Sequence, residues 1–230
     1  IPNFIRAQEQ FAPHTMLVPC AGMGLHATYD RIGLALFCLA IYDARSQIER
    51  IMAQYVENAC LMAKVFAEKR LCPIYLIGDD IAYKGTTMFS PSFLRQTFFP
   101  ALRRVITPLK EADIKVIFHS DGNLMGILDD LIEAGIDGLN PIEPLAGMDI
   151  GLLKRKYGCK LVLVGNVDCS QLLPLGTVED VRNGVKACLH AAGRGGGLFI
   201  GSSSEIVPAT PLENVLAFYD AIREFGTYPM

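Results

Sequence analysis

Short apolar runs alternate along the chain with longer stretches in which apolar residues recur every three or four positions. The short runs are nearly continuous in apolar residues, which is typical of strands buried on both faces, and each run ends in glycine or a polar residue. We predict six strands from these runs, within TMLVPCAG (15–22), CPIYLIGDD (72–80), KVIFHSDG (115–122), DGLNPIEP (137–144), KLVLVGNVD (160–168) and GLFIGSSSE (197–205).

The longer stretches predict amphipathic helices at 44–70, 91–111, 124–134, 149–157, 177–192 and 211–225. This alternation fits βα units with right-handed crossovers, so we predict an α/β fold with parallel strands covered by helices. Six units are visible, whereas an eight-unit TIM-type barrel takes about 250 residues. We therefore expect a TIM-type (β/α)8 barrel that lacks its N-terminal units, with an open doubly wound sheet as the alternative. No low-complexity linker divides residues 1–230, which predicts a single domain.

The composition narrows the classes of partner. The chain has 230 residues, 51% hydrophobic, with a net charge of -3, which fits a large soluble domain. No apolar stretch reaches the roughly 18 residues of a membrane span, and no basic block suggests nucleic acid. We expect a small-molecule substrate or a protein partner, and a homodimer stays open.

The cysteines indicate the cellular compartment, and the first residue indicates whether the sequence begins at a natural start. Seven cysteines without a CxxC pair indicate free thiols in a reducing compartment, which predicts a cytoplasmic protein. The chain begins at Ile1 and not at methionine, so we expect further residues upstream.

Polar side chains follow the predicted strands where each run ends. In parallel α/β folds the carboxyl ends of the strands carry the ligand site. His119, Asp121 and Asp80 are the expected catalytic groups, because histidine exchanges protons near neutral pH and acids protonate leaving groups. The expected substrate-binding residues are Asp79, Tyr83, Glu143, Asn166, Asp168 and Glu205. Aspartate and asparagine at such places also cap helices and turns, and that alternative stays open.

Four blocks of the chain resemble successive blocks of the uroporphyrinogen decarboxylase superfamily. They begin with GDDIAYKG (78–85), HSDGNLMG (119–126), LVLVGNVD (161–168) and GGGLFIGS (195–202). That superfamily contains porphyrinogen decarboxylases and methyltransferases that act with corrinoid proteins or thiol acceptors. The resemblance implies a TIM-type barrel with a deep site at its carboxyl face.

Two departures from the family pattern bear on the reaction. The decarboxylases carry a late Gly-His-Gly where this chain reads GSSSEI (201–206), so the resemblance is closer to the methyltransferase branch. That branch commonly binds zinc through His-x-Cys and a later cysteine. Here the pattern is His119, Ser120 and Asp121, with Ser204 near the later position, so we expect no sulfur-ligated zinc and assign no metal ligands, whereas a metal site of histidine and carboxylate ligands stays open.

The resemblance implies methyl transfer from a small methylated compound to a corrinoid protein or another acceptor. In this hypothesis His119 and the strand-end acids donate protons, no cofactor is bound tightly, and a partner protein supplies the corrinoid. A methyltransferase is favoured over a carboxy-lyase. Uroporphyrinogen III-type decarboxylation and a non-catalytic barrel that binds a small ligand stay as alternatives, so whether the chain is an enzyme is open.

Overall fold

The structure is a computed structural model that describes residues 1–227, and the chain divides into two compact units. The first unit contains Ile1–Asp80, Ser90–Phe118 and Glu133–Ile136. The second contains Ile81–Phe89, His119–Ile132 and the chain from Asp137 onward. Two boundaries between the units fall near strand ends, after Asp80, two residues beyond β2, and before His119, the last residue of β5.

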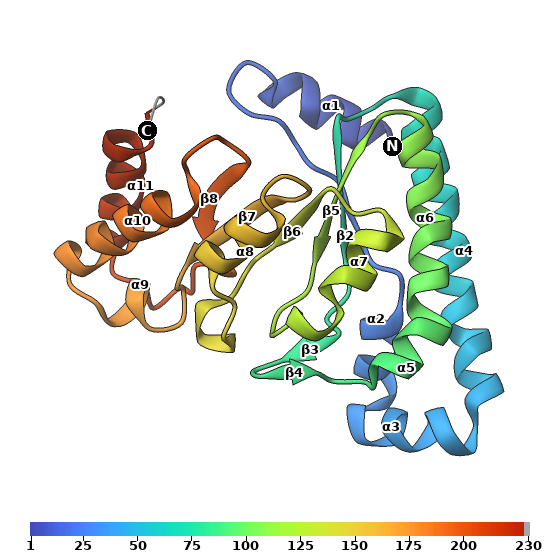
Figure 1. Cartoon of the computed structure of the whole chain (residues 1–230). Helices are drawn as coiled ribbons and strands as arrows, with labels where there is room; N and C mark the ends of the chain where they lie inside the picture. The colour runs from blue at the N-terminus through green and yellow to red at the C-terminus, as the bar shows by residue number, and fades with distance from the viewer. Residues whose placement is uncertain (228–230) are drawn as a thin grey trace. The chain divides into compact units, whose positions relative to one another are not determined.

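The first unit consists of parallel strands and the helices packed against them (Figure 1). Its strands follow the order β1 (Cys20–Ala21), β2 (Ile74–Gly78) and β5 (Lys115–His119), and β1 is parallel to β2 with Cys20 opposite Leu76. Only His119, the last residue of β5, belongs to the second unit. The helices are α1 (Pro2–Phe11), α2 (Leu25–Ile32), α3 (Leu34–Asp43), α4 (Arg45–Lys69), α5 (Pro91–Phe93), the π-helical segment η1 (Leu94–Phe98) and α6 (Phe99–Glu111).

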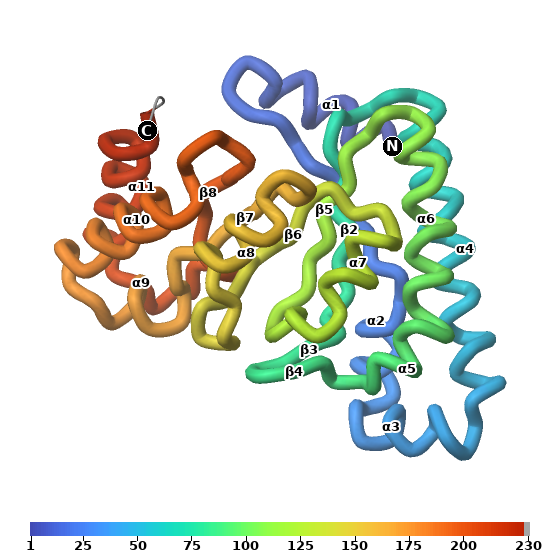
Figure 2. The backbone as a smooth tube through the Cα atoms, in the orientation of Figure 1, coloured from blue at the N-terminus to red at the C-terminus, as the bar shows by residue number. Residues whose placement is uncertain are grey.

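Two long helices, α4 and α6, lie side by side and supply much of the core of the first unit (Figure 2). The buried residues of α4 recur at spacings of four and three, as one face of a helix requires, and include Met52, Val56, Ala59, Ala63 and Phe66. Phe66 meets Tyr75 of β2 edge to face, with 5.4 Å between the ring centroids. Such a pair contributes about 1 kcal/mol beyond its buried area, so it ties α4 to the strand.

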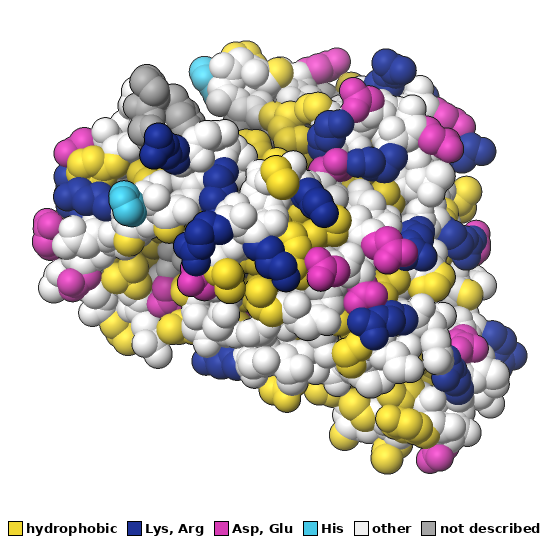
Figure 3. Space-filling model, in the orientation of Figure 1, with side chains coloured by type: hydrophobic (Ala, Val, Ile, Leu, Met, Phe, Trp, Pro, Cys, Tyr) yellow, Lys and Arg dark blue, Asp and Glu magenta, His cyan; other side chains and the backbone are white. Residues whose placement is uncertain are grey.

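The outer surface of α3 is apolar. Leu36, Leu39 and Tyr42 are 57%, 62% and 82% exposed, and Phe37 is the buried residue of the helix. Figure 3 shows hydrophobic side chains gathered at the lower right, over this helix. Because α3 has no polar face, its sequence lacks the amphipathic period that marks the other long helices, and periodicity does not predict it.

The second unit is built on three strands in the order β6 (Gly138–Asn140), β7 (Val162–Val167) and β8 (Leu198–Ser202). Both pairs are parallel, with Leu139 opposite Leu163 and Val167 opposite Ser202. An antiparallel hairpin joins β3 (Ala82–Tyr83) to β4 (Thr86–Thr87). The helices of this region are the 3-10 turns η2 (Met125–Ile127) and η3 (Pro144–Ala146), and α7 (Leu128–Ala134), α8 (Ile150–Tyr157), α9 (Leu172–Leu175), α10 (Val178–Ala192) and α11 (Leu212–Phe225).

Local signals explain where α10 begins and which face it buries. The Thr177 hydroxyl accepts the N–H of Asp180 at 3.2 Å, and the Asp180 carboxylate accepts the N–H of Thr177 at 2.9 Å. This capping box satisfies two amides that the helix leaves without partners. From there Val181, Val185 and Leu189 recur every four residues and are buried, and α10 packs beside α11 (Figure 1).

The predicted α/β class with parallel strands is confirmed. Each of the six predicted runs contains a strand, and the six predicted helices agree with the structure to within a few residues. Helices α1, α2 and α3 and the β3–β4 hairpin are absent from the sequence-based prediction. Closure into a barrel and the single domain stay predictions. Among residues 1–227, no helix has the length and apolar character needed to span a membrane.

The alternation of burial along β7 generates a stability prediction. Leu163 is fully buried, whereas its neighbour Val162 is half-buried. Leu163→Ala should lower the free energy of unfolding by about 3 kcal/mol, because it leaves a cavity in the core, and Val162→Ala should cost less than half as much. Urea denaturation followed by circular dichroism measures both. Equal losses would contradict the faces assigned to β7.

Candidate active site

The carboxyl end of β2 carries two consecutive aspartates of the first unit. Asp79 is 2% exposed, and its two carboxylate oxygens accept the N–H groups of Met23 at 2.7 Å and His26 at 2.6 Å. These amides lie at the start of α2, whose own N-cap residue, Gly24, offers no side chain. Asp79 therefore caps α2 from the neighbouring strand. Burial raises the pKa of its carboxyl group to about 6.

Asp80 contacts two aromatic side chains of α2. Its carboxylate Oδ2 lies 3.1 Å from His26 Nδ1, and its main-chain carbonyl accepts the Tyr29 hydroxyl at 3.0 Å. The rings of His26 and Tyr29 stack with 4.9 Å between their centroids. His26 is not among the site residues predicted from the sequence, because the prediction did not include helix α2. The segment HATYD (26–30) nevertheless combines a histidine with a nearby tyrosine and aspartate.

His119 ends β5 and belongs to the second unit. Its Nδ1 lies 2.6 Å from the side-chain oxygen of Asn140, the last residue of β6. Because an amide oxygen only accepts, Nδ1 carries the hydrogen, and Nε2 is the basic nitrogen of the neutral ring. Nε2 faces Asp121 Oδ1 at 3.9 Å. Asn140 is a site residue that the sequence prediction missed, although it is the polar residue that ends the run DGLN.

The loop after His119 is shaped by a glycine. Gly122 has φ +90°, and a Cβ atom built on it would lie 2.4 Å from the main-chain nitrogen of Tyr83, so another residue would not fit without a backbone shift. Its N–H donates to Glu143 Oε2 at 2.6 Å, and the N–H of Asn123 donates to the Tyr83 carbonyl at 3.0 Å. The first bond holds Glu143, and the second holds β3, next to the loop that carries the catalytic candidates.

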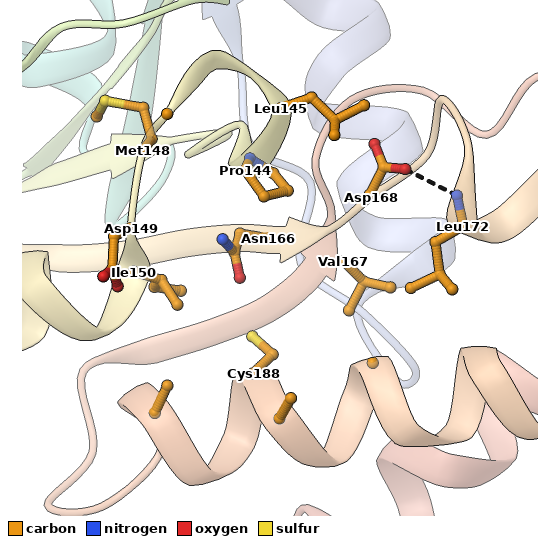
Figure 4. Close-up of a pocket in the computed structure, with 14 residues that line it drawn as sticks. Pro144, Leu145, Met148, Asp149, Ile150, Asn166, Val167, Asp168, Leu172 and Cys188 are labelled. Atoms are coloured by element: carbon orange, nitrogen blue, oxygen red, sulfur yellow. Dashed lines mark hydrogen bonds between the residues drawn. The ribbon is translucent and has the colours of Figure 1, made fainter.

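A pocket of about 570 Å³ lies in the second unit beside the end of β7. It is bounded by the loop after β6, the end of β7 and the face of α10, and Figure 4 shows Asn166 and Cys188 pointing into it. Its lining is mainly apolar, with Leu145, Met148 and Ile150 from the loop and the start of α8. Burial raises the pKa of the Cys188 thiol, which keeps it neutral near pH 7.

Asp168 lies on the rim of this pocket but is bonded to the backbone. Its carboxylate accepts the N–H groups of Ser170, Gln171 and Leu172 at 3.2, 2.8 and 2.7 Å. Figure 4 shows the bond to Leu172. Three amide donors on one carboxylate are typical of a residue that shapes a turn before a helix. Asp168 therefore caps this turn, which is the alternative that the sequence left open. Its part in substrate binding stays a prediction.

The predicted site residues are divided between the two units. Asp79 and Asp80 belong to the first unit, and His119, Asp121 and Glu143 come together in the second. Tyr83 of β3 lies beside the same loop, bonded through its carbonyl to Asn123, with its side chain 55% exposed. The remaining candidates lie elsewhere in the second unit: Asn166 and Asp168 at the pocket, and Glu205 exposed after β8.

Known proteins resemble this chain over most of its length. The model of the family described as Uroporphyrinogen decarboxylase (URO-D) matches residues 30–225. Methylcobamide:CoM methyltransferase MtaA of Methanosarcina barkeri is 26% identical over 152 residues, which cover 66% of this chain and 42% of that protein. Uroporphyrinogen decarboxylase of Coxiella burnetii is 34% identical over 78 residues, 34% of this chain and 21% of that enzyme.

The solved structure of a methyltransferase from Methanosarcina mazei is similar to 99% of this chain, with a TM-score of 0.73 and 26% identity, and the match covers 65% of that protein. The methylated-thiol–coenzyme M methyltransferase of Methanosarcina mazei is also 26% identical, over 66% of this chain and 38% of its own length. The matched part of the chain thus spans less than half the length of these two sequence relatives.

The buried carboxyl group of Asp79 generates a pH prediction. Its pKa is raised from 3.8 to about 6, so the folded protein binds this proton more tightly than the unfolded chain does. The resulting stabilisation of the folded protein is complete below the pKa that Asp79 has in the unfolded chain. It is lost as the pH rises through the pKa that Asp79 has in the folded protein. Between about pH 4.5 and 7.5 it should fall by about 2 kcal/mol.

Asp79→Asn should abolish that fall, because an amide does not titrate. Free energies of unfolding from urea titrations at both pH values would measure it for the wild type and the variant. Stability curves that run parallel between the two pH values would rule out a raised pKa at Asp79.

Proposed function

The chain belongs to the uroporphyrinogen decarboxylase (URO-D) family, and on that premise we propose that it transfers a methyl group from a small methylated compound to a corrinoid protein or another acceptor. The similarity to methyltransferases supports this choice because it covers 66% of the chain in sequence and 99% in structure. The stretch similar to a decarboxylase covers 34%. Family membership alone does not select a reaction, so the site must support it.

The observation that carries the proposal is the fixed imidazole of His119. Asn140 accepts its Nδ1–H, which sets the ring orientation and leaves Nε2 as the nitrogen that exchanges a proton. Asp121 faces the same nitrogen, and Glu143 is held beside their loop through Gly122. A histidine held in one orientation among acids is suited to protonate a leaving atom.

Methyl transfer needs such a proton. In the proposed reaction an electron pair of the acceptor forms the new bond to the methyl carbon, and the bond from that carbon to oxygen, nitrogen or sulfur breaks. The heteroatom keeps the electron pair of the broken bond and takes a proton from His119. A positioned acid contributes about 10² to 10⁴ in rate when a poor leaving group must be protonated, as for an ether oxygen.

The donor set of this chain does not fit the sulfur-ligated zinc of the methyltransferase branch. Asp121 stands where that branch commonly has a cysteine, and serines occupy the later position. The hydroxyl of Ser203 is buried and bonded to Cys169, accepting its N–H at 3.2 Å and lying 3.5 Å from its sulfur. Oxygen donors are harder and hold zinc less tightly than thiolates, so no step of the proposed reaction uses a metal-bound thiolate.

Decarboxylation is the second candidate function. The 34% identity to the Coxiella burnetii enzyme favours it, although the matched stretch is short. Loss of carbon dioxide from a carboxylated side chain leaves an electron pair on carbon, which also requires a proton donor. The site chemistry therefore supports both reactions, and the two differ in the substrate and in the product released.

The two functions are separated by one pair of assays on the full chain. We would incubate the protein with cob(I)alamin and a panel of methyl ethers, methylamines and methyl thioethers, and follow methylcobalamin formation by absorbance. A parallel reaction would contain uroporphyrinogen III, with carbon dioxide release as the readout. We expect methylcobalamin with at least one donor class. Carbon dioxide release without any methyl transfer would overturn the proposal in favour of the decarboxylase.

The role of His119 is tested by substitution. His119→Ala should slow methyl transfer about 100- to 10,000-fold, because the leaving heteroatom loses its proton donor, while the melting temperature changes little. His190→Ala, at an exposed position near the end of α10, is the matched control and should keep the wild-type rate. A normally folded His119→Ala protein with wild-type turnover and substrate affinity would exclude this role.

A further inference from the structure

His26 of α2 is held beside Asp79 and Asp80 by contacts on three sides. Its main-chain N–H donates to the buried carboxylate of Asp79 at 2.6 Å, and its ring stacks on Tyr29 at 4.9 Å between centroids. Its Nδ1 lies 3.1 Å from Asp80 Oδ2. Tyr29 also donates its hydroxyl to the main-chain carbonyl of Asp80 at 3.0 Å, so ring and carboxylate are fixed to the same short segment.

The carboxylate of Asp80 next to Nδ1 defines the chemistry of the ring. Because a carboxylate oxygen carries negative charge and only accepts, its approach to 3.1 Å favours a hydrogen on Nδ1 of the neutral imidazole, which makes Nε2 the basic nitrogen. Within residues 1–227, Nε2 of His26 makes no hydrogen bond, and the side chain is 45% exposed. Carboxylate–imidazole pairs of this kind serve in unrelated enzymes, where the acid orients the ring and the far nitrogen moves the proton.

We infer that His26 and Asp80 form a second proton-transfer pair, in which Asp80 is the positioning residue and His26 Nε2 exchanges the proton with a bound ligand. The inference rests on the proposed function and refines the expectation from the sequence for Asp80, whose carboxylate orients a histidine and does not itself deliver the proton. The protonated ring releases its Nε2 hydrogen to a basic atom of the ligand and is left neutral, whereas the departing heteroatom of the methyl-transfer step takes its proton from His119.

The residues that support the start of α2 differ from the side chain of His26 that would transfer the proton. Asp79 supports the start of α2 through main-chain amides of Met23 and His26, so replacing the side chain of His26 leaves that cap in place. His26→Gln should therefore fold and keep its melting temperature. Tyr29 is buried with its ring against Phe37, at 6.2 Å between centroids, which anchors the stacking partner independently of His26.

The tautomer of His26 is the first test, and it does not depend on any reaction. Long-range proton–nitrogen spectra of the full chain labelled with 15N-histidine, at about pH 8.5 where an ordinary imidazole is neutral, report which ring nitrogen carries the hydrogen. Four histidines give four ring systems, and the His26 signals are those lost in His26→Gln. If that variant fails to fold, His26→Asn provides the assignment.

We expect the Nδ1–H form for His26 in the wild type and its loss in Asp80→Ala. An Nε2–H or averaged ring in the wild type, or a spectrum unchanged by Asp80→Ala, would overturn the pair.

The second test measures how the pair is used. With the methyl donor found for the wild type, His26→Gln should lower kcat at least tenfold with little change in KM. His14→Gln, at an exposed position also in the first unit, is the matched control and should leave both constants unchanged. Methyl transfer by His26→Gln at the wild-type rate would overturn the inference and leave the proposed function standing. Absence of methyl transfer in the wild type would overturn the proposed function, and the spectra would still decide whether the pair exists.

Discussion

Parallel pairing of β6, β7 and β8 is the constraint on which the second unit depends. Parallel neighbours must be joined by crossover segments, and the helices in those segments cover the sheet, so the strands themselves are apolar. Polar side chains are then tolerated only where a strand ends. Because the three strands run in the same direction, Asn140, Val167 and Ser202 end them at one edge. Chemistry at that edge is a consequence of the topology.

The side chains that fix the two histidines also lie at strand ends. His119 is held through Nδ1 by an amide oxygen of the next strand, and His26 through Nδ1 by a carboxylate that follows β2. In both cases a short polar side chain at the end of a strand sets the tautomer of a ring. The two units thus reach the same chemical result with different acceptors, an amide for one ring and a carboxylate for the other.

The strands and their polar ends were predictable because both follow from local pattern. Continuous apolar runs such as KVIF and KLVLV marked β5 and β7, and the residue after each run marked the edge that carries the site. Helix α3 was not predictable in this way, because Leu36, Leu39 and Tyr42 leave it without a polar face.

The partners of the site residues could not be predicted, because they are set by tertiary contacts. Asp79 and Asp80 are adjacent in the chain, yet one caps a helix 53 residues away through the N–H of His26 and the other binds the ring of that residue. Asn140 lies 21 residues from His119. Sequence pattern alone identifies such groups as polar strand ends, whereas their roles depend on which helix or strand lies beside them.

The central claim is that an amide from the neighbouring strand holds the imidazole of His119 in the form that performs the chemistry. A double-mutant cycle on kcat/KM for methyl transfer, with His119→Ala, Asn140→Ala and both together, tests it most directly. We expect Asn140→Ala to slow the reaction in the wild-type background and to have no further effect once His119 is gone. Losses that add in the double variant would show that the two side chains act independently and would contradict the claim.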